Sequence, residues 1–186
     1  EKYGNSDPEN DPILFVLAPH SIYTVSSKTL RWIGDFTRDN QLPLHIHVSE
    51  TKKEVDDCVT QNGLRPIEYL DSLGVLGPRT VAAHTIWLNE KELDILAKRG
   101  VTVVHNPVSN MKLSSGSCFP YKELRDRNIR MMIGTDGCSS NNNLDLFEEM
   151  KIAALLQKHH FSDPELMSAE EIFAIGCGSS TGTGAD

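Results

Sequence analysis

The sequence predicts an α/β fold built around a parallel sheet, and two observations lead to this prediction. Five short segments are near-continuous apolar runs, which are typical of strands buried on both faces of a parallel sheet. Helical patterns with recognisable caps lie between these segments, and the connections are short. The chain has 186 residues, of which 39% are hydrophobic, and this is enough for one domain with its own core.

The elements follow in order along the chain. The expected strands are the apolar runs at 13–20, 42–50, 80–88, 101–107 and 129–137. The expected helices begin at polar caps or at a proline, and several end at a glycine. They lie at 26–40, 51–63, 65–74, 89–100 and 144–160, the last being the longest and the most clearly amphipathic. The stretch FPYKELRDRN at 119–128 is expected to be a solvated helix face.

The two ends of the chain differ in composition from the rest. We expect a polar N-terminal segment at 1–12, one folded domain at 13–175 and a flexible Gly/Ser-rich tail at 176–186.

Composition also bounds the partners and the location. A net charge of −8 argues against nucleic acid or an anionic membrane as the main partner. No apolar run approaches the roughly 20 residues of a membrane span, and the first residues lack the apolar core of a signal peptide. The four cysteines are scattered without a CxxC spacing, as expected for reduced thiols in a cytoplasmic protein.

Chemically active side chains recur where the predicted strands end. They are His20, His47 with Glu50, His84, His105 with Asn106, and Asp136. In a β/α barrel the active site lies at the carboxyl ends of the strands, so we expect these side chains to converge. Imidazole and carboxylate ligands favour zinc or a similar divalent ion, which lowers the pKa of water towards about 7.

Each of these residues also has a plain structural interpretation, because a lone buried histidine is more often a hydrogen-bonded core residue. His45 and His47 point the same way in a strand, but His45 lies one step further from the strand end. We interpret His45 as a packing residue. His159 and His160 end a helix, where a cation suits the dipole. Cys138, two residues from Asp136, is an alternative soft ligand.

Four motifs carry a family resemblance. They are HVSE at 47–50, AAHTIWL at 82–88, HNPVSNMKLSSG at 105–116 and GTDGCSSNNNLDLFEEMKIAALLQK at 134–158. The chain resembles the amidohydrolase superfamily from about residue 13 to about residue 171. It is most similar to the 5′-methylthioadenosine/S-adenosylhomocysteine deaminases, a likeness that APHSIYT at 18–24 shares. The resemblance implies a partial TIM (β/α)8 barrel of about five parallel β/α units, equivalent to strands 4–8.

The resemblance also implies residue roles. His47 and Asp136 correspond to metal ligands, for Zn²⁺ or alternatively Fe²⁺. Glu50 corresponds to the general acid/base that contacts the purine ring, and His84 to a catalytic residue over the nucleophilic water and the substrate. His20 corresponds to a substrate-binding residue near the ribose. The implied reaction is hydrolytic deamination of an adenosine-type nucleoside, in which Glu50 protonates N1 and Asp136 passes a proton to the departing ammonia.

The sequence departs from the family at its start. The His-x-His of the first barrel strand and strands one to three are absent, so we expect weaker metal binding. The open sheet edges lead us to expect a homo-oligomer. Two alternatives remain open. One is another amidohydrolase, of the guanine deaminase or triazine hydrolase type, and the other is a non-catalytic, self-associating fragment.

Overall fold

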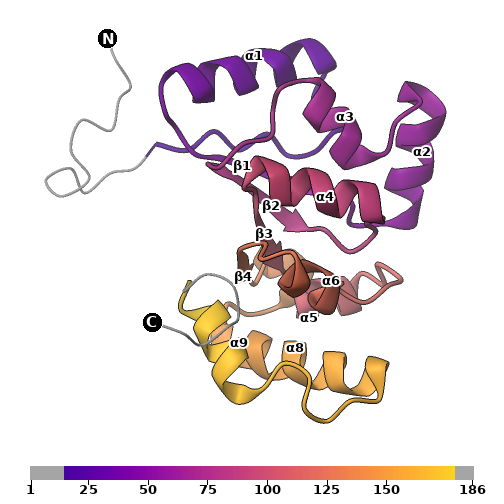
Figure 1. Cartoon of the computed structure of the whole chain (residues 1–186), viewed down its shortest axis with the longest axis vertical. Coiled ribbons are helices and arrows are strands. Elements are labelled where there is room, and N and C mark those ends of the chain that lie inside the picture. Colours follow the sequence, from indigo (N-terminus) through magenta and orange to yellow (C-terminus); the bar gives the residue numbers. More distant parts are fainter. Residues whose placement is uncertain (1–14, 179–186) are drawn as a thin grey trace, which may run out of the picture.

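The sheet at the centre of the molecule is parallel, as the apolar runs predicted. The computed structural model describes residues 15–178. Four strands lie in the order β1-β2-β3-β4, namely β1 Leu44–Val48, β2 Thr80–His84, β3 Thr102–His105 and β4 Met131–Ile133. Each neighbouring pair is parallel. Figure 1 shows the strands running between helices α1–α4 and helices α5, α6, α8 and α9.

The helices begin and end close to the predicted signals. Their bounds are α1 Ser27–Asp39, α2 Lys52–Asn62, α3 Pro66–Ser72, α4 Glu90–Arg99, α5 Pro107–Lys112, α6 Tyr121–Asp126, α7 Cys138–Asn141, α8 Leu146–Phe161 and α9 Ala169–Gly176. Side-chain caps at Ser26, Thr51 and Asn89 accept from the third backbone N–H of their helices. Gly63 and Gly100 end α2 and α4 in the left-handed conformation, which glycine adopts without steric cost.

The expected strand at 13–20 is wrong as a regular element within the part of the chain that is described. Only two isolated parallel bridges occur there, Leu17 to Leu44 and Ser21 to His47. Pro19 has no N–H to donate, so the segment cannot form a continuous ladder. It still lies along β1, because His45 N–H donates to Leu17 O and His47 N–H donates to His20 O.

The two faces of the sheet are covered unequally. Residues that pair across the strands share a face, and one such row is buried among the helices: Ile46, Ala82, Val103 and Met131. The row on the opposite face is half-buried or exposed: His47, Ala83, Val104 and Met132. The face that a complete barrel would enclose is therefore open in this chain.

Two helices differ from their predicted patterns. The stretch 119–128 is not simply a solvated face, because Phe119, Tyr121 and Leu124 are almost completely buried in the core. The buried side of α8 is mostly polar, since it consists of Glu149, Ala153 and Gln157. The reason is hydrogen bonding, because these polar groups reach partners in the core.

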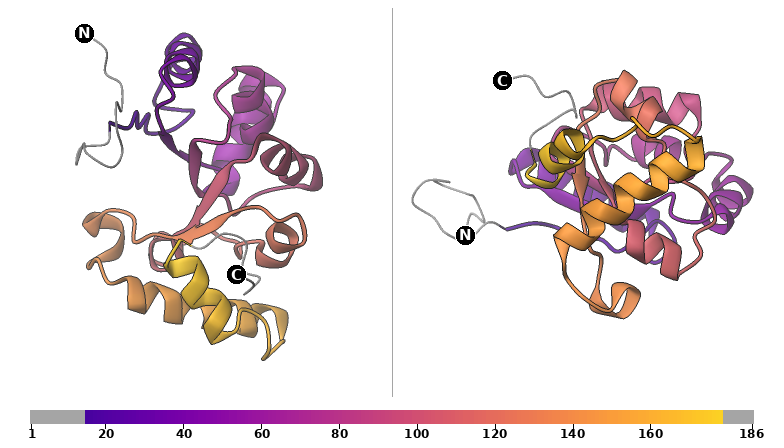
Figure 2. Two further views of the ribbon diagram at one scale, coloured as in Figure 1. Left: turned by 60° about the vertical axis from the view of Figure 1, so that its left-hand side comes forward. Right: turned by 90° about the horizontal axis from the view of Figure 1, so that it is seen from below.

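The C-terminal helices α8 and α9 lie side by side in both views of Figure 2. The predicted segment 1–12 and all but the first three residues of the predicted tail lie outside the described residues. The predicted domain limits stay predictions.

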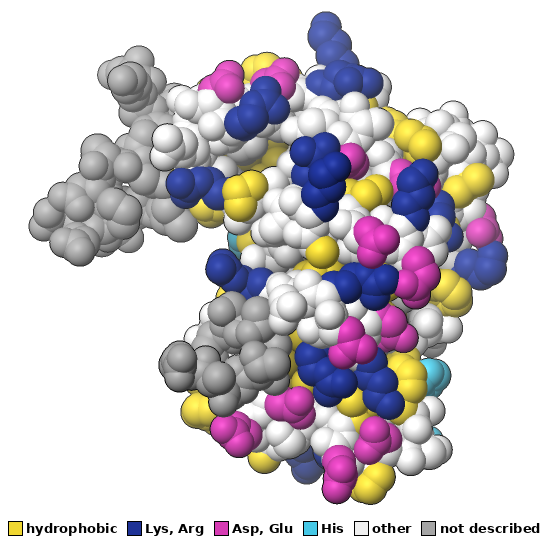
Figure 3. All heavy atoms as spheres, in the orientation of Figure 1, with side chains coloured by type: hydrophobic (Ala, Val, Ile, Leu, Met, Phe, Trp, Pro, Cys, Tyr) yellow, Lys and Arg dark blue, Asp and Glu magenta, His cyan; other side chains and the backbone are white. Residues whose placement is uncertain are grey.

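The described surface carries charges of both signs. Figure 3 shows Lys and Arg side chains interspersed with Asp and Glu side chains on one face. Arg127, for example, pairs with Asp94 at 2.9 Å and with Glu90, both on α4. Within residues 15–178, none of the helices has both the length and the apolar character that crossing a membrane requires.

Candidate metal centre

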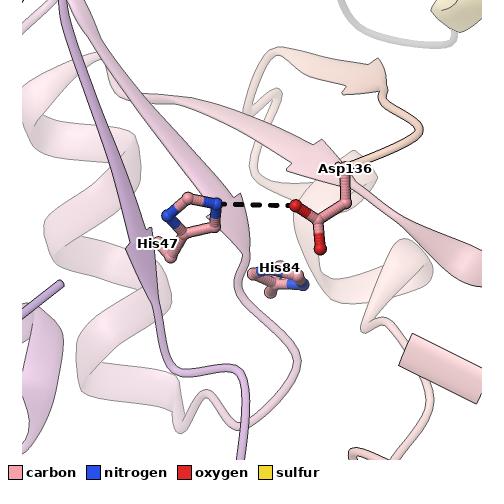
Figure 4. Close-up of side chains that lie close together, drawn as sticks. All are labelled: His47, His84 and Asp136. Carbon is pink, nitrogen blue, oxygen red and sulfur yellow. Dashed lines mark ion pairs between the residues drawn. The ribbon is translucent and has the colours of Figure 1, made fainter. Parts of the chain in front are cut away.

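Three of the predicted site residues converge at the carboxyl ends of the strands. One possible ligand atom from each of His47, His84 and Asp136 lies within 4.8 Å of the others. His47 comes from β1, His84 ends β2, and Asp136 follows β4 (Figure 4). His47 Nε2 lies 3.7 Å from Asp136 Oδ1, and the His47 and His84 rings lie 5.4 Å apart. Residues almost ninety positions apart thus meet at one point.

Each histidine of this cluster has one ring nitrogen held by a neighbour. His47 Nδ1 lies 2.9 Å from the backbone oxygen of His20, which can only accept, so Nδ1 carries the proton. His84 Nδ1 lies 2.8 Å from Asn110 Oδ1, which also accepts. The lone pair of each neutral ring is therefore on Nε2. This is the arrangement of metal-binding histidines, whose second nitrogen donates to a carbonyl or carboxylate.

The carboxylate of Asp136 is held on both oxygens. Ser109 Oγ donates to Oδ2 at 2.7 Å, and the backbone N–H of Gly137 donates to Oδ1 at 2.8 Å. Burial acts to raise the pKa of Asp136, but these hydrogen bonds, with His84 and His47 nearby, hold the pKa below its ordinary value. Asp136 is therefore an anion at neutral pH, as a metal ligand must be.

His84 and Asp136 have unusual backbone conformations, which direct their side chains into the cluster. In register, His84 pairs with Val48, so strand alternation alone would place it among the helices. Its φ of +72° lies in the left-handed region instead, and its ring reaches that of His47. Asp136 has a φ of +59°. Such conformations cost about 1–3 kcal/mol in a non-glycine residue and cluster at functional sites.

Glu50 lies beside this cluster on the turn after β1. Its Oε2 is 3.8 Å from His84 Nε2. Glu54 fixes the turn, because its carboxylate accepts from the backbone N–H of Ser49 at 2.9 Å and of Glu50 at 2.8 Å. Burial raises the pKa of Glu54 to about 7, although the backbone hydrogen bonds act to lower it.

The remaining predicted residues take different places. The exposed His20 lies next to the cluster, with its ring 5.1 Å from that of His47 and its Nδ1 3.1 Å from Thr24 Oγ1. His45 shares the open face with His47, one step deeper along β1, and is exposed there. Asn106 supports the Asp136 loop: with its amide turned so that Nδ2 donates to Val104 O, Oδ1 accepts from Asp136 N–H at 3.2 Å.

The expectation that His105 joins the site is wrong. It ends β3 without leaving the strand conformation, stays on the helix-facing side, and stacks on Phe119 with ring centroids 4.3 Å apart. Burial lowers the pKa of His105 to about 3, and His84 acts in the same direction. Cys138, His159 and His160 also lie outside the cluster of possible ligands in the described residues.

Three supporting residues were not identified from the sequence: Ser109, Asn110 and Glu54. The first two lie in the motif HNPVSN, which the sequence offered only as a resemblance. Glu54 lies three residues after the cap Thr51, in the T-x-x-E pattern of a capping box. That pattern could have indicated Glu54 as a supporting residue. A capping box bonds the Glu side chain to the backbone of the cap residue, whereas Glu54 accepts from the two residues before the cap, Ser49 and Glu50.

The donor set fits a divalent metal ion. Imidazole nitrogen and carboxylate oxygen are both ligands of catalytic zinc sites, which keep one position open for water. His47 and Asp136 offer one atom of each kind, and the third member, His84, lies close enough to contact the ion or its water. The hydrogen bonds that orient both rings and the carboxylate supply the support such ligands need.

Comparison with known proteins identifies the family to which this chain belongs. The model of the Amidohydrolase family matches residues 7–178. The chain belongs to the amidohydrolase family. Among curated amidohydrolase relatives, a 5′-deoxyadenosine deaminase of Methanoregula boonei is 52% identical over 174 residues, which are 94% of this chain and 39% of the relative. A 5-methylthioadenosine/S-adenosylhomocysteine deaminase of Archaeoglobus fulgidus is 45% identical, covering 89% of this chain and 39% of its own length.

A solved amidohydrolase structure supports the fold. An adenosine deaminase from Xanthomonas campestris with bound zinc superposes with a TM-score of 0.81 at 39% identity. The match covers 91% of this chain and 40% of that protein. A partial β/α barrel, as the resemblance implied, therefore describes this amidohydrolase chain, which spans about two fifths of the length of its relatives.

Proposed function

We propose that this chain carries the catalytic residues of a metal-dependent hydrolytic deaminase that acts on adenosine-type nucleosides, such as 5′-methylthioadenosine or S-adenosylhomocysteine. The observation that supports this most is the convergence of His47, His84 and Asp136, each oriented by its own hydrogen bond. The names of the most similar relatives point to the same substrate class.

The proposed roles follow from the positions of the side chains. His47 and Asp136 hold the metal, with Zn²⁺ as the proposed ion and Fe²⁺ as the alternative. A divalent ion bound there would supply a nucleophile near neutral pH, because it lowers the pKa of water. Asp136 is ionised and beside His47, so it can accept a proton and later release it to the leaving ammonia.

Glu50 and His84 form the proton-donating and orienting side of the site. The Glu50 carboxyl group lies at the edge of the cluster, on a turn fixed by Glu54, and is proposed to protonate N1 of the purine ring. The fixed His84 ring is proposed to orient the attacking water through Nε2. The exposed His20 is proposed to contact the ribose.

The test measures metal content and catalytic turnover on the same preparation of the chain. Chain purified without chelator is analysed by plasma mass spectrometry and then assayed for ammonia release from the two nucleosides and from 5′-deoxyadenosine. We expect about one zinc or iron per chain and an inosine-type product, both lost in Asp136→Asn. Turnover of guanine or a triazine in place of the nucleosides would show the alternative amidohydrolase. A metal-loaded chain that releases no ammonia from any of these substrates would contradict the proposed activity.

Self-association is the second proposal, and a specific feature of the surface favours it. Apolar side chains are exposed on α8 and α9, including Phe147 at 75%, Leu155 and Phe173. The inner face of the sheet is half-buried or exposed as well, and β4 has no strand beyond it among the described residues. We propose that copies of the chain form a homo-oligomer, which sedimentation velocity tests directly. An oligomer without metal or turnover would be the non-catalytic, self-associating fragment.

We further propose a cytoplasmic location without nucleic-acid or membrane partners. All four cysteines are free, which suits a reducing compartment. Cell fractionation and a nucleic-acid retention assay at low salt test these proposals.

A further inference from the structure

A strand that gives no ligand nevertheless leads into the site. His105 ends β3 facing the helices, and the chain then turns through Asn106 and Pro107 into α5. Two consecutive residues of this short helix, Ser109 and Asn110, are buried and lie against the cluster. Ser109 contacts Asp136, and Asn110 contacts His84.

We propose that Ser109 and Asn110 are a pair of positioning residues, which set the carboxylate orientation of Asp136 and the tautomer of His84. The proposal extends the metal-dependent function proposed above, on which its functional meaning rests. Each acts through the residue to which it is hydrogen-bonded, Ser109 through Asp136 and Asn110 through His84, and not on the reacting atoms.

The Asn110 contact decides where His84 carries its proton. The distance from His84 Nδ1 to Asn110 Oδ1 is 2.8 Å, and an amide oxygen has no proton to give. The Nδ1–H tautomer follows, with the lone pair on Nε2 directed towards the Glu50 side of the site. A neutral imidazole free in water prefers the opposite, Nε2–H tautomer, so Asn110 holds His84 in the less common form.

The Ser109 contact decides how Asp136 lies. Its hydroxyl donates to Oδ2, the Gly137 N–H donates to Oδ1, and in this orientation Oδ1 lies 3.7 Å from His47 Nε2. Without Ser109 the carboxylate keeps only the bond from its neighbouring residue. The left-handed backbone of Asp136 then has one fewer contact to hold the side chain in place.

A third element fixes α5 itself. Glu149 of α8 is fully buried, and its Oε2 accepts from the backbone N–H of Val108 at 3.1 Å. Its other oxygen accepts from Asn141, whose amide also donates to Thr135 O at 2.7 Å. Glu149 therefore ties the first turn of α5 to the loop that carries Asp136, so the pair and its targets are placed together.

The experiment reads the His84 tautomer in the metal-free chain. The ring nitrogens are followed by ¹⁵N NMR, with His84→Gln used for assignment. We expect Nδ1–H in the native chain and in Asn110→Asp, which keeps an acceptor, and a shift towards Nε2–H in Asn110→Ala. Nε2–H in the native chain, or an unchanged tautomer in a folded Asn110→Ala, would overturn the Asn110 assignment.

The proposed role of Ser109 in orienting Asp136 is tested by zinc affinity, measured in competition with a chromophoric chelator. We expect roughly a tenfold loss in Ser109→Ala and recovery in Ser109→Thr, in line with the effect of removing partners of ligands. The matched control is Ser115→Ala, because the Ser115 hydroxyl is buried in the same region without a hydrogen-bond partner among the described residues. Equal zinc affinity in Ser109→Ala and Ser115→Ala would overturn it.

Neither readout requires turnover. A correct tautomer in a metal-binding chain that releases no ammonia would leave the positioning pair standing and count against the proposed deaminase activity alone.

Discussion

The carboxylate of Glu54 accepts a hydrogen bond of 2.8 Å from the backbone N–H of Glu50, the proposed general acid. The same carboxylate accepts from Ser49, whose carbonyl in turn receives the N–H groups of Ile86 and Trp87 after β2. One buried side chain therefore links the turn that carries Glu50 to the loop that follows His84.

Glu54→Gln should show a cost that depends on pH. Burial raises the folded-state pKa from 4.5 to about 7, so the folded chain binds the proton more tightly than the unfolded chain. This tighter proton binding contributes on the order of 3 kcal/mol to the free energy of unfolding. The contribution is complete below pH 4.5 and is lost as pH rises through 7. Because Gln cannot ionise, the Glu54→Gln variant does not lose stability in this way as pH rises.

The measurement for Glu54 is urea unfolding at pH 5 and pH 8. At pH 5 the native side chain is a neutral acid whose two oxygens can both still accept, whereas the Gln amide nitrogen cannot accept from a backbone N–H, so the variant should lose about 1–3 kcal/mol. The difference from the native chain should shrink or reverse at pH 8. Asp56→Asn, on the exposed side of α2, is the control. A loss that grows with pH would contradict the expectation.

His105→Leu should flatten the acid side of the stability curve. Both ring nitrogens of His105 are buried without a hydrogen-bond partner among the described residues, and burial lowers its pKa to about 3. The unfolded chain binds this proton near pH 6.5, so stability rises with pH between about 3 and 6.5. Unfolding at pH 4.5 and 7 measures the slope, which should be smaller in the variant. An unchanged slope would show that His105 takes up its proton in the folded chain.

Asp136→Asn should reduce bound metal by about tenfold or more, because an amide oxygen replaces the anionic ligand, and loss of a ligand's hydrogen-bond partner alone already costs about tenfold. Cys138→Ser provides the matched control two residues away, and should keep the metal content of the native chain, since Cys138 lies outside the cluster. Plasma mass spectrometry on both variants gives the comparison. Metal lost from Cys138→Ser and kept by Asp136→Asn would point to a thiolate ligand instead.

Gly34→Ala should destabilise the fold although Ala favours helices over Gly by about 1 kcal/mol. A Cβ on Gly34 would lie 2.7 Å from the backbone oxygen of Gly74, so α1 would have to move away from the turn after α3. We expect a net loss of about 1–3 kcal/mol in thermal unfolding. Gly77→Ala is the control, because a Cβ there meets nothing within 4 Å. Equal melting temperatures would mean that the contact relaxes without cost.

Local signals accounted for most of the elements. The caps at Ser26, Thr51 and Asn89 and the glycine ends of α2 and α4 were readable because they act within a few residues. The 13–20 segment failed as a regular strand, since Pro19 interrupts its donors. In α8 the burial of Glu149 and Gln157 was not predictable, because their partners lie about 40 residues away.

The sequence by itself determined that parallel strands would bring polar residues together at the carboxyl ends of the strands. Apolar runs joined by short helical connections indicate parallel strands, whose carboxyl ends lie at the same end of the sheet. It did not determine which of those residues would meet. His84 and His105 both end strands on the helix-facing side, but only His84 leaves that side, through a left-handed backbone. That conformation is held by contacts from distant segments, so only the tertiary structure decided that His84 joins His47 and Asp136 while His105 packs in the core.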